Sequence, residues 1–330
     1  MNQEFPYWVL AYYYIGTIEN PEQEVARHHA FFKDRDVKCR IYISKDGING
    51  QTSASVQAAR EYLEWMKADP RFEKMPFKIH EAKEHAFPKT TVKFRKQLVA
   101  INEELDLSRR GEHVSPADWK RMLEQKDQNT VLIDVRNRYE WEIGHFENAD
   151  FPDCETFREF PTYVRALKER CDPKTTPIMM YCTGGIRCEF ASALMLQEGF
   201  EKIYQLEGGV IDYGLDQGGD FWKGKLFVFD DRLVVPISDD EKEPVGHCAH
   251  CGVNQDLCFN CANMDCNDLF VCCNSCLHLH KGCCSDSCMQ APRVRPYRTD
   301  GTTKPFRKLN QEAMKAPACC ESVHEASLPH

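Results

Sequence analysis

The stretch YCTGGIRCEFAS, residues 181–192, decides the fold because it links a buried strand to a helix. The run before it, PIMMY (177–181), is apolar without alternation, which is typical of a parallel strand covered on both faces. The helix that follows has an apolar face over residues 190–195. Functional sites collect at the carboxyl ends of strands in open parallel sheets. The stretch therefore predicts an α/β domain with Cys182 at the position of a site.

The loop after the strand has the features of an anion cradle around Cys182. Its two glycines let it curl so that several backbone N–H groups point inward, and the helix N-terminus adds a partial positive charge. Arg187 adds a full charge, and together these lower the pKa of the thiol. The alternative is a small buried cysteine in a tight turn. We expect catalytic use of Cys182, with an anion or transferred group held by Thr183, Gly184, Gly185 and Ile186.

The first hundred residues have the element order of a ferredoxin-like fold. An apolar run and a helical pattern occupy 7–34, and an alternating strand occupies 37–44. The turn of KDGINGQTS leads into a paired strand, a helix capped by Ser55 and a closing strand. This β-α-β-β-α-β order predicts an α+β ferredoxin-like, or acylphosphatase-like, domain over residues 1–100. We expect the extended residues 91–100 to carry the chain out of this domain.

A chain of 330 residues is long enough for several domains. The motif SPADW offers an N-cap, a proline and an acid for a helix that begins near Ser115. The apolar runs VLIDV and PIMMY then favour a parallel sheet. The expected segments after the first domain are a linker at 101–114, the α/β domain at 115–220, a β-rich connector at 221–246, a small cysteine-rich metal-binding region at 247–290, and a basic, partly disordered tail at 291–330.

The stretch LIDVRNRYEWEIGHFENAD resembles the signature of the rhodanese family. The match is carried by Asp134, Val135, Arg136, Glu140, Trp141, Gly144, His145 and Ala149. It departs at Asn148, where the family usually has glycine. The loop CTGGIR has the rhodanese spacing between cysteine and arginine, one residue shorter than in the related phosphatases, which disfavours phosphatase activity. This resemblance alone implies a parallel-sheet rhodanese domain and a sulfur carrier with a persulfide on Cys182.

The order of motifs along the chain is similar to that of the bacterial tRNA uridine hydroxylases. KDGING, YCTGGIRCE, YQLEGGVIDY and GHCAHCG carry the resemblance, which covers residues 5–255. It implies an oxygen-dependent oxidoreductase that converts uridine 34, at the wobble position of tRNA, into 5-hydroxyuridine. Dioxygen would be a substrate and the tRNA anticodon arm a partner. The resemblance also implies that loss of Cys182 abolishes hydroxylation.

Two neighbours of Cys182 are the expected catalytic helpers. Cys188 either resolves an oxidised Cys182 as a disulfide or packs beneath the loop. Arg187 binds a phosphate or stabilises the thiolate, the alternative being a structural brace of the loop. We expect Asp134 and Arg136 to tie the strand end to its neighbours, a structural role.

No organic cofactor is recognisable in the sequence. A GxGxxG motif after a strand, which would indicate a flavin or a nicotinamide, is absent from it. His145 and Glu147 have the spacing of an iron site, but they lie inside the rhodanese signature, so iron ligation is disfavoured. The two histidines of HEAKEH (80–85) are expected on a solvated face.

Eleven of the eighteen cysteines fall between Cys248 and Cys288. Without an export signal, this density indicates metal ligation rather than disulfides. The repeated Cys-x2-Cys pairs, as in CAHC and CFNC, favour structural zinc over an iron–sulfur cluster, and we expect two or more zinc ions. The predicted ligands are Cys248, Cys251, Cys258, Cys261, Cys266, Cys272, Cys273, Cys276, Cys283, Cys284 and Cys288, with His247, His250, His278 and His280 as further donors.

Two basic stretches favour an RNA partner, although the formal net charge of -9 argues against nonspecific coating of nucleic acid. The first, just before the α/β domain, contains Lys89, Lys93, Arg95 and Lys96. The second, residues 292–308, has six Lys or Arg against one Asp, with two aromatic residues among them. The alternative for either stretch is a solvated charged surface. tRNA itself follows only from the resemblance. The predicted RNA-binding residues are Lys89, Lys93, Arg95, Lys96, Arg293, Arg295 and Arg298.

The composition, 42% hydrophobic and 28% charged, is that of an ordinary soluble protein. The sequence has no apolar run of roughly 18 residues and no signal-peptide pattern at its start. We therefore expect a cytoplasmic protein without a membrane partner. The first hypothesis is a tRNA uridine hydroxylase. The alternatives are a rhodanese-type sulfurtransferase and a metal-stapled RNA-binding module without catalysis.

Overall fold

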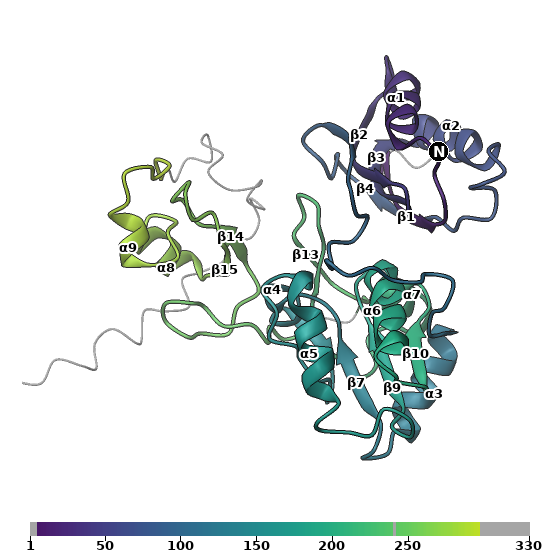
Figure 1. Cartoon of the computed structure of the whole chain (residues 1–330). Coiled ribbons are helices and arrows are strands. Elements are labelled where there is room, and N and C mark those ends of the chain that lie inside the picture. Colours follow the sequence, from purple (N-terminus) through teal and green to yellow (C-terminus); the bar gives the residue numbers. More distant parts are fainter. Residues whose placement is uncertain (1–4, 240–241, 298–330) are drawn as a thin grey trace, which may run out of the picture. The chain divides into compact units, whose positions relative to one another are not determined.

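The computed structural model describes residues 5–239 and 242–297 (Figure 1). The chain divides into two compact units, one from residues 1–136 and 152–217 and the other from residues 137–151 and 218–330. Within the described ranges, no helix is both long enough and apolar enough to cross a membrane.

The N-terminal sheet of the first unit has five strands in the order β4-β1-β3-β2-β5. They are β1 (Tyr7–Ile15), β2 (Val37–Ser44), β3 (Gly47–Ser55), β4 (Lys78–Ala82) and β5 (Thr90–Phe94). β1 is antiparallel to β3 and β4, and β2 is antiparallel to β3. β5 pairs with β2 in parallel at the edge. The segment expected to lead out of this domain is therefore in part its fifth strand.

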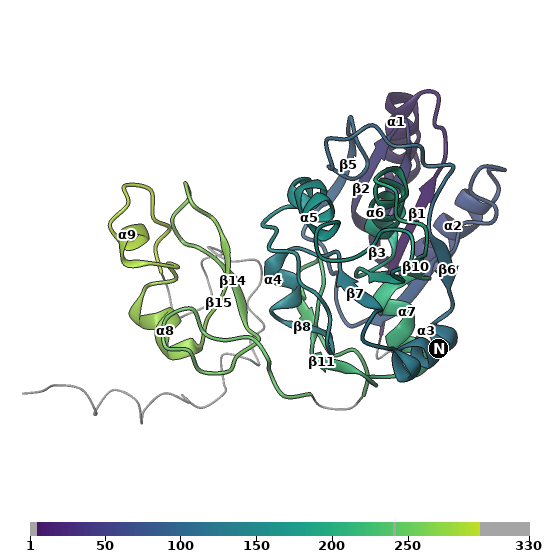
Figure 2. The ribbon, with the colours of Figure 1, turned by 60° about the horizontal axis from the view of Figure 1, so that its bottom comes forward.

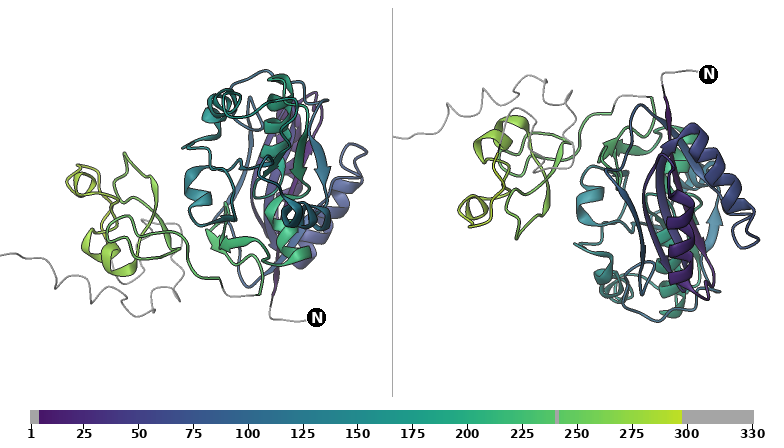
Figure 3. Two further views of the ribbon diagram at one scale, coloured as in Figure 1. Left: turned by 90° about the horizontal axis from the view of Figure 1, so that it is seen from below. Right: turned by 90° about the horizontal axis from the view of Figure 1, so that it is seen from above.

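Two helices, α1 (Pro21–Phe32) and α2 (Val56–Lys67), cover one face of this sheet (Figure 3). Ser55 caps α2 as predicted, because its side chain accepts a hydrogen bond from the N–H of Ala58. Side chains alternate along β1, so Leu10 and Tyr12 pack in the core beneath the helices. Tyr13, the residue after Tyr12, points to the other side of the sheet, which we call the helix-free face.

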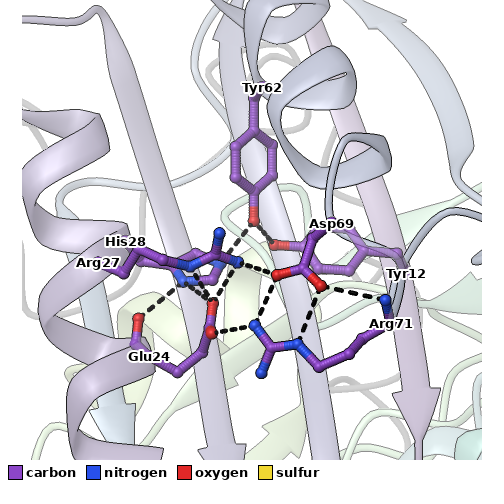
Figure 4. Close-up of polar contacts among 7 residues, drawn as sticks. All are labelled: Tyr12, Glu24, Arg27, His28, Tyr62, Asp69 and Arg71. Atoms are coloured by element: carbon purple, nitrogen blue, oxygen red, sulfur yellow. Dashed lines mark hydrogen bonds and ion pairs between the residues drawn. The ribbon is translucent and has the colours of Figure 1, made fainter.

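A buried polar network holds α1 in place (Figure 4). Glu24, 4% exposed, accepts a hydrogen bond of 2.7 Å from Arg71 and one of 2.9 Å from Arg27. The ring of buried His28 lies 3.1 Å from Glu24 Oε1 and 3.1 Å from the Tyr62 hydroxyl. Burial alone would raise the pKa of Glu24, but hydrogen bonds from His28, Arg27 and Arg71 lower it to about 2. The carboxylate is thus ionised and fixed within the fold.

The second sheet of the first unit is parallel, with the order β6-β10-β9-β7. Its strands are β6 (Glu112–Val114), β7 (Val131–Asp134), β9 (Ile178–Tyr181) and β10 (Ile203–Leu206). Every residue of β9 is buried, as its unbroken apolar run predicts. The α-helices of this part are α3 (Pro116–Gln125), α5 (Phe160–Leu167), α6 (Ile186–Gln197) and α7 (Gly209–Gln217), and a 3-10 helix, η1 (Phe157–Glu159), precedes α5.

The second unit is built from short elements, with α8, α9, β14 and β15 in its cysteine-rich part (Figure 2). Its β8 pairs with β11, so residues 144–146 of the expected α/β domain bond to residues 222–224 beyond it. The predicted fold class is confirmed: a ferredoxin-like domain, a parallel α/β domain and a cysteine-rich region. The elements are α4 (Arg138–Trp141), β8 (Gly144–Phe146), β11 (Trp222–Gly224), β12 (Leu226–Phe227), β13 (Val234–Val235), β14 (Cys258–Asn260), β15 (Leu269–Val271), α8 (Asn274–Leu279) and α9 (Asp286–Met289).

Candidate active site and cysteine clusters

Cys182 follows β9 directly, and the predicted loop joins it to α6. Gly185 is the N-cap of α6 and has a φ of 102°, which a side chain rarely tolerates. This conformation turns the N–H of Gly185 toward Cys182, and it donates a hydrogen bond of 3.1 Å to the sulfur Sγ. The loop therefore curls around the thiol as its glycines predict.

The first residues of α7 form hydrogen bonds to the backbone of this loop. The N–H groups of Val210 and Ile211 donate to the carbonyl oxygens of Cys182 and Thr183, at 3.0 Å and 3.1 Å. A Cβ at Gly209 would lie 2.5 Å from the Cys182 carbonyl oxygen, so only glycine fits this close approach. Sequence reasoning missed Gly209 as a site residue, although the double glycine of YQLEGGVIDY was the available signal.

Cys182 and Cys188 form a coupled pair with opposite pKa shifts. Cys182 is 1% exposed, and burial alone would raise its pKa. A hydrogen bond from Cys188, the charge of Arg187 and backbone N–H groups of Arg187 and Gly185 instead lower the pKa of Cys182 to about 5. Burial and the same hydrogen bond raise the pKa of Cys188. At neutral pH the pair is a Cys182 thiolate next to a Cys188 thiol.

Charged side chains brace the loop and the strand beside it. Arg187 reaches back across it, with Nη2 3.4 Å from the hydroxyl of Thr183. At the end of β7, Arg136 and Asp134 form a bidentate ion pair of 2.8 Å and 2.6 Å, with both side chains fully buried. This pair braces the strand next to β9. His145 belongs to the second unit, where its Nδ1 is 2.8 Å from the carbonyl oxygen of Trp141.

Lys78, on β4 of the N-terminal sheet, contacts the loops around Cys182. Its side chain is 9% exposed. Nζ donates to the carbonyl oxygens of Gly184, at 3.1 Å, and of Gly208, and it lies 3.3 Å from Asp212 Oδ1. These three acceptors match the three N–H bonds of the ammonium group. Burial lowers the pKa of Lys78, and the charge of Asp212 opposes this shift.

Glu189 provides a second contact with the N-terminal sheet. Its buried carboxylate accepts hydrogen bonds from the Tyr13 hydroxyl at 2.9 Å and from Arg110 at 3.0 Å, and His113 Nε2 lies 2.9 Å away. Burial alone would raise the pKa of Glu189, but these partners lower it, His113 most of all. Tyr13 also restricts which residue fits at position 185, since a Cβ at Gly185 would lie 2.9 Å from the Tyr13 hydroxyl oxygen.

Eight of the predicted metal ligands form two groups that could each hold a metal ion. We call them the first and second cysteine sites. The sulfurs of each group lie within 4.8 Å of one another, and the cysteines in the described part of the chain are free of disulfides. The first site consists of Cys248, Cys251, Cys273 and Cys276, and the second of Cys261, Cys266, Cys284 and Cys288.

The sulfur spacing of both sites fits zinc. A tetrahedral ion with Zn–S bonds of about 2.3 Å separates its sulfurs by about 3.8 Å. In the first site Cys251 and Cys273 are 3.8 Å apart. In the second, Cys284 lies 3.7 Å from Cys266 and 3.8 Å from Cys288. The two sites interleave along the chain, because the pair at 261 and 266 falls between the two pairs of the first site.

The remaining cysteines of the region lie outside both groups. Cys258 is on β14 and packs in an apolar cluster with Phe227 and Val271. Cys272 lies 3.9 Å from Cys248 but is not part of the first site, and Cys283 is likewise outside the second. Of the four histidines, His250 and His280 stack on each other with ring centroids 3.6 Å apart. None of the four belongs to either four-sulfur group.

The predicted RNA-binding residues have different surroundings. Lys89, Lys93, Arg95 and Lys96 are all exposed, on β5 and the residues beside it. Arg293 pairs with Asp265 at 2.7 Å, and Arg295 donates to Asn267 Oδ1 at 2.7 Å, so both bond within the cysteine-rich region. Arg298 lies outside the described residues.

Family models match three consecutive parts of the chain. The UPF0176 acylphosphatase-like domain matches residues 7–98, the rhodanese-like domain residues 115–214 and the rhodanase C-terminal model residues 223–289. These matches cover the two domains of the first unit and the cysteine-rich region.

Relatives that carry the description "tRNA uridine(34) hydroxylase" match nearly the whole chain. The protein of Protochlamydia amoebophila (strain UWE25) is 53% identical over 93% of this chain and 96% of its own. The protein of Chlamydia pneumoniae is 51% identical over 96% of this chain and 99% of its own. That of Chlamydia trachomatis serovar D is 51% identical over 97% and 98%. The chain therefore belongs to the tRNA uridine(34) hydroxylase family.

Proposed function

We propose that the protein hydroxylates C5 of uridine 34 in tRNA, giving 5-hydroxyuridine, and that Cys182 acts directly on the base. The observation that carries the proposal is a buried thiol whose pKa is lowered to about 5, at the end of a parallel strand. It is supported by relatives of 51–53% identity described as tRNA uridine(34) hydroxylases. Those descriptions do not favour a sulfurtransferase or a non-catalytic RNA-binding module.

The chemistry that suits Cys182 is attack on the uracil ring. The thiolate is the nucleophilic form of cysteine, and it would form a bond from sulfur to C6 while the C5–C6 electron pair moves toward the C4 carbonyl oxygen. This leaves C5, the position to be hydroxylated, rich in electrons. Dioxygen is the proposed oxidant: one of its oxygen atoms goes to C5 and the other leaves as water, which takes two electrons from a soluble reductant and two protons. Loss of the C5 proton and departure of the Cys182 thiolate from C6 then restore the C5–C6 double bond. Arg187 and the loop N–H groups would keep the thiol ionised for this step.

Cys188 has two roles open to it in this scheme. Its thiol donates the hydrogen bond that helps to ionise Cys182. It is also the group next to Cys182 that could resolve an oxidised sulfur as a disulfide. A serine at position 188 separates these roles, because a hydroxyl keeps the donor and cannot form a disulfide.

The proposed substrate is tRNA, bound through its anticodon arm, and the proposed place of action is the cytoplasm. A base must leave its stack to reach Cys182, as in other enzymes that modify a base. Lys89, Lys93, Arg95 and Lys96 are exposed cations near one sheet edge and suit phosphate contacts. We keep the basic segment around Arg293 as a second proposed contact.

We propose one structural zinc ion in each cysteine site. Each site offers four cysteine sulfurs, which as thiolates would fill all four positions of a tetrahedral ion and leave none open for a substrate. Zinc also has no redox chemistry, so these ions would stabilise the region and take no part in oxidation.

The test is nucleoside mass spectrometry on tRNA from cells that lack the protein and are complemented with wild type, Cys182→Ala or Cys171→Ala. Cys171 is the matched control, a half-buried cysteine of the same unit whose sulfur faces the carbonyl oxygen of Leu167. We expect 5-hydroxyuridine and its derivatives to return with wild type and the control only. If 5-hydroxyuridine persists without the protein and a thiolated nucleoside disappears, the protein is a sulfurtransferase. If both persist, the proposal of catalysis is wrong.

A further inference from the structure

The strands of the N-terminal sheet bring positive charge and no negative charge to its helix-free face. The acids that lie against this face, Glu189 and Asp212, come from the α/β domain and are bonded to Tyr13 and Lys78. β1, β2, β3 and β5 contain no Asp or Glu at all. The single acid of β4, Glu81, pairs with Trp8 and therefore points to the helix side. Lys38, Arg40 and Lys93 point to the helix-free face. In a chain of net charge -9, the part of this face over β2, β3 and β5, to which these strands contribute no acid, fits a polyanion.

A row of paired residues crosses this face from the Cys182 loop to the sheet edge. Tyr13 on β1 is paired with Asn49 on β3, and Asn49 is paired with Tyr42 on β2. Tyr42 is paired in turn with Lys93 on β5. Directly paired residues share a face, and neighbouring strands are about 4.8 Å apart, so the row spans about 14 Å. Its Tyr13 end bonds to Glu189 beside the catalytic loop.

The side chains of this row suit unpaired nucleotides. The guanidinium of Arg95 lies over the ring of Tyr42, 4.7 Å from its centroid, and forms a flat cationic surface on which a base can stack. The half-buried amides of Asn49 and Gln51 can bond to base edges. Exposed Lys93 can bind phosphate. Double-stranded RNA would use the cations alone, since its bases are already stacked and paired.

We propose that the helix-free face of the N-terminal sheet binds single-stranded RNA, and that it holds the nucleotides next to the target while the target base enters the Cys182 loop. This inference rests on the proposed function and adds the surface that selects an unpaired strand. The row leads to the loop, because Tyr13 bonds to Glu189 and its hydroxyl lies beside Gly185.

The test compares variants for binding to an anticodon stem-loop oligonucleotide with an unmodified uridine 34, in a Cys182→Ala background. Tyr42→Ala removes one stacking surface, worth about 1–3 kcal/mol per base, so we expect binding to weaken by about 5- to 150-fold. Phe31→Ala is the matched control: Arg35, in the turn after α1, lies over its ring at 4.2 Å, but Phe31 is on α1, which covers the opposite side of the sheet. Binding to a fully paired RNA duplex should not change with Tyr42→Ala.

A second variant does not depend on the folding of a half-buried site. Lys93 is exposed, so Lys93→Gln should remove about one phosphate contact. The slope of the logarithm of the binding constant against the logarithm of the salt concentration should become shallower by about 1. The inference is overturned if Tyr42→Ala and Lys93→Gln both bind the stem-loop as wild type does, or if Tyr42→Ala and Phe31→Ala weaken it equally. A loss with Tyr42→Ala on the duplex as large as on the stem-loop would also overturn it.

Failure of the proposed function would look different. Binding in this assay needs no catalysis, because Cys182 is absent from every variant. Specific stem-loop binding through Tyr42, in a protein whose absence leaves 5-hydroxyuridine intact in cells, would refute the hydroxylase and support the binding surface. Normal hydroxylation by Tyr42→Ala with unchanged stem-loop affinity would refute the surface alone.

Discussion

Lys78→Met is expected to open the site around Cys182. Methionine keeps an unbranched side chain, one heavy atom shorter than lysine, but has no N–H donor. The carbonyl oxygens of Gly184 and Gly208 therefore lose their hydrogen bonds to β4. Asp212 is 36% exposed and can be solvated after the change. The two carbonyls therefore carry most of the cost. Gly184 and Gly208 are half-buried, so each carbonyl oxygen left without its partner costs about 1–2 kcal/mol, in the lower part of the range for a buried acceptor. Part of this is regained because a buried ammonium group is removed.

We expect the free energy that holds the N-terminal sheet against the loop to fall by about 2–3 kcal/mol. Since about 1.4 kcal/mol is a factor of ten, the open form becomes about 30- to 150-fold more populated. Cys182 is buried, so its alkylation requires opening. The rate of iodoacetamide labelling should therefore rise by the same factor, measured on the peptide that contains Cys182. Lys74→Met, at an exposed lysine of the same domain, is the control.

The reasoning is refuted if Lys78→Met labels within twofold of the wild-type rate, or if Lys74→Met accelerates labelling equally. Circular dichroism must show a folded protein, because global unfolding would expose every cysteine. Cys39 reports on this directly, since it lies in the core of the N-terminal domain, and its labelling should stay slow in Lys78→Met.

Three further predictions concern other parts of the molecule. Cys188→Ala removes a hydrogen-bond donor and should raise the pKa of Cys182 above its value of about 5, whereas Cys188→Ser should keep that pKa low. The pH profile of Cys182 alkylation measures the pKa in both variants. If Cys188→Ser keeps a low pKa and still loses hydroxylation, Cys188 has a resolving role. Because the folded-state pKa of Glu24 is lowered to about 2, its contribution to stability is present above about pH 4.5 and is lost as the pH falls toward 2. Glu24→Gln should thus cost about 2 kcal/mol at pH 7, after allowance for solvent screening, and much less at pH 3, as measured by urea unfolding; an equal cost at both pH values would contradict the assigned cause. Zinc analysis should find two ions per chain in wild type and in Cys258→Ala, and fewer in Cys276→Ser, so an unchanged content in the last variant would exclude Cys276 as a ligand.

Local patterns explain which features could be predicted from the sequence. The loop around Cys182 depends on a strand, two glycines and a helix start within a few residues, so the sequence could predict its conformation. Lys78 was not, because it bonds to the carbonyl of Gly184, a residue 106 positions away, and nothing in KIHEA marks its role. Gly209 was missed for a similar reason, since its constraint comes from the backbone of another loop.

The cysteines show the limit of spacing as a guide. The pairs 248/251 and 273/276 each supply two ligands to the first site, as a Cys-x2-Cys knuckle does. The equally spaced Cys258 and Cys261 behave differently. Cys258 is held in the β14–β15 pairing and packs in an apolar cluster, whereas Cys261 follows the strand and joins the second site. Spacing alone does not contain this difference, because strand pairing decides where each sulfur points.

The interleaved order of the cysteine sites has a consequence for the newly made chain. Synthesis proceeds from the N-terminus, so Cys248 and Cys251 emerge first and the half-site at 261 and 266 emerges next. At that moment four of the eight candidate ligands are present, two from each site. An ion captured by this early set is held by the wrong combination until residues 273–288 are made. Correct loading therefore requires thiolates to exchange on the metal, and the rate of that exchange, rather than the affinity of either finished site, would limit how fast this region matures.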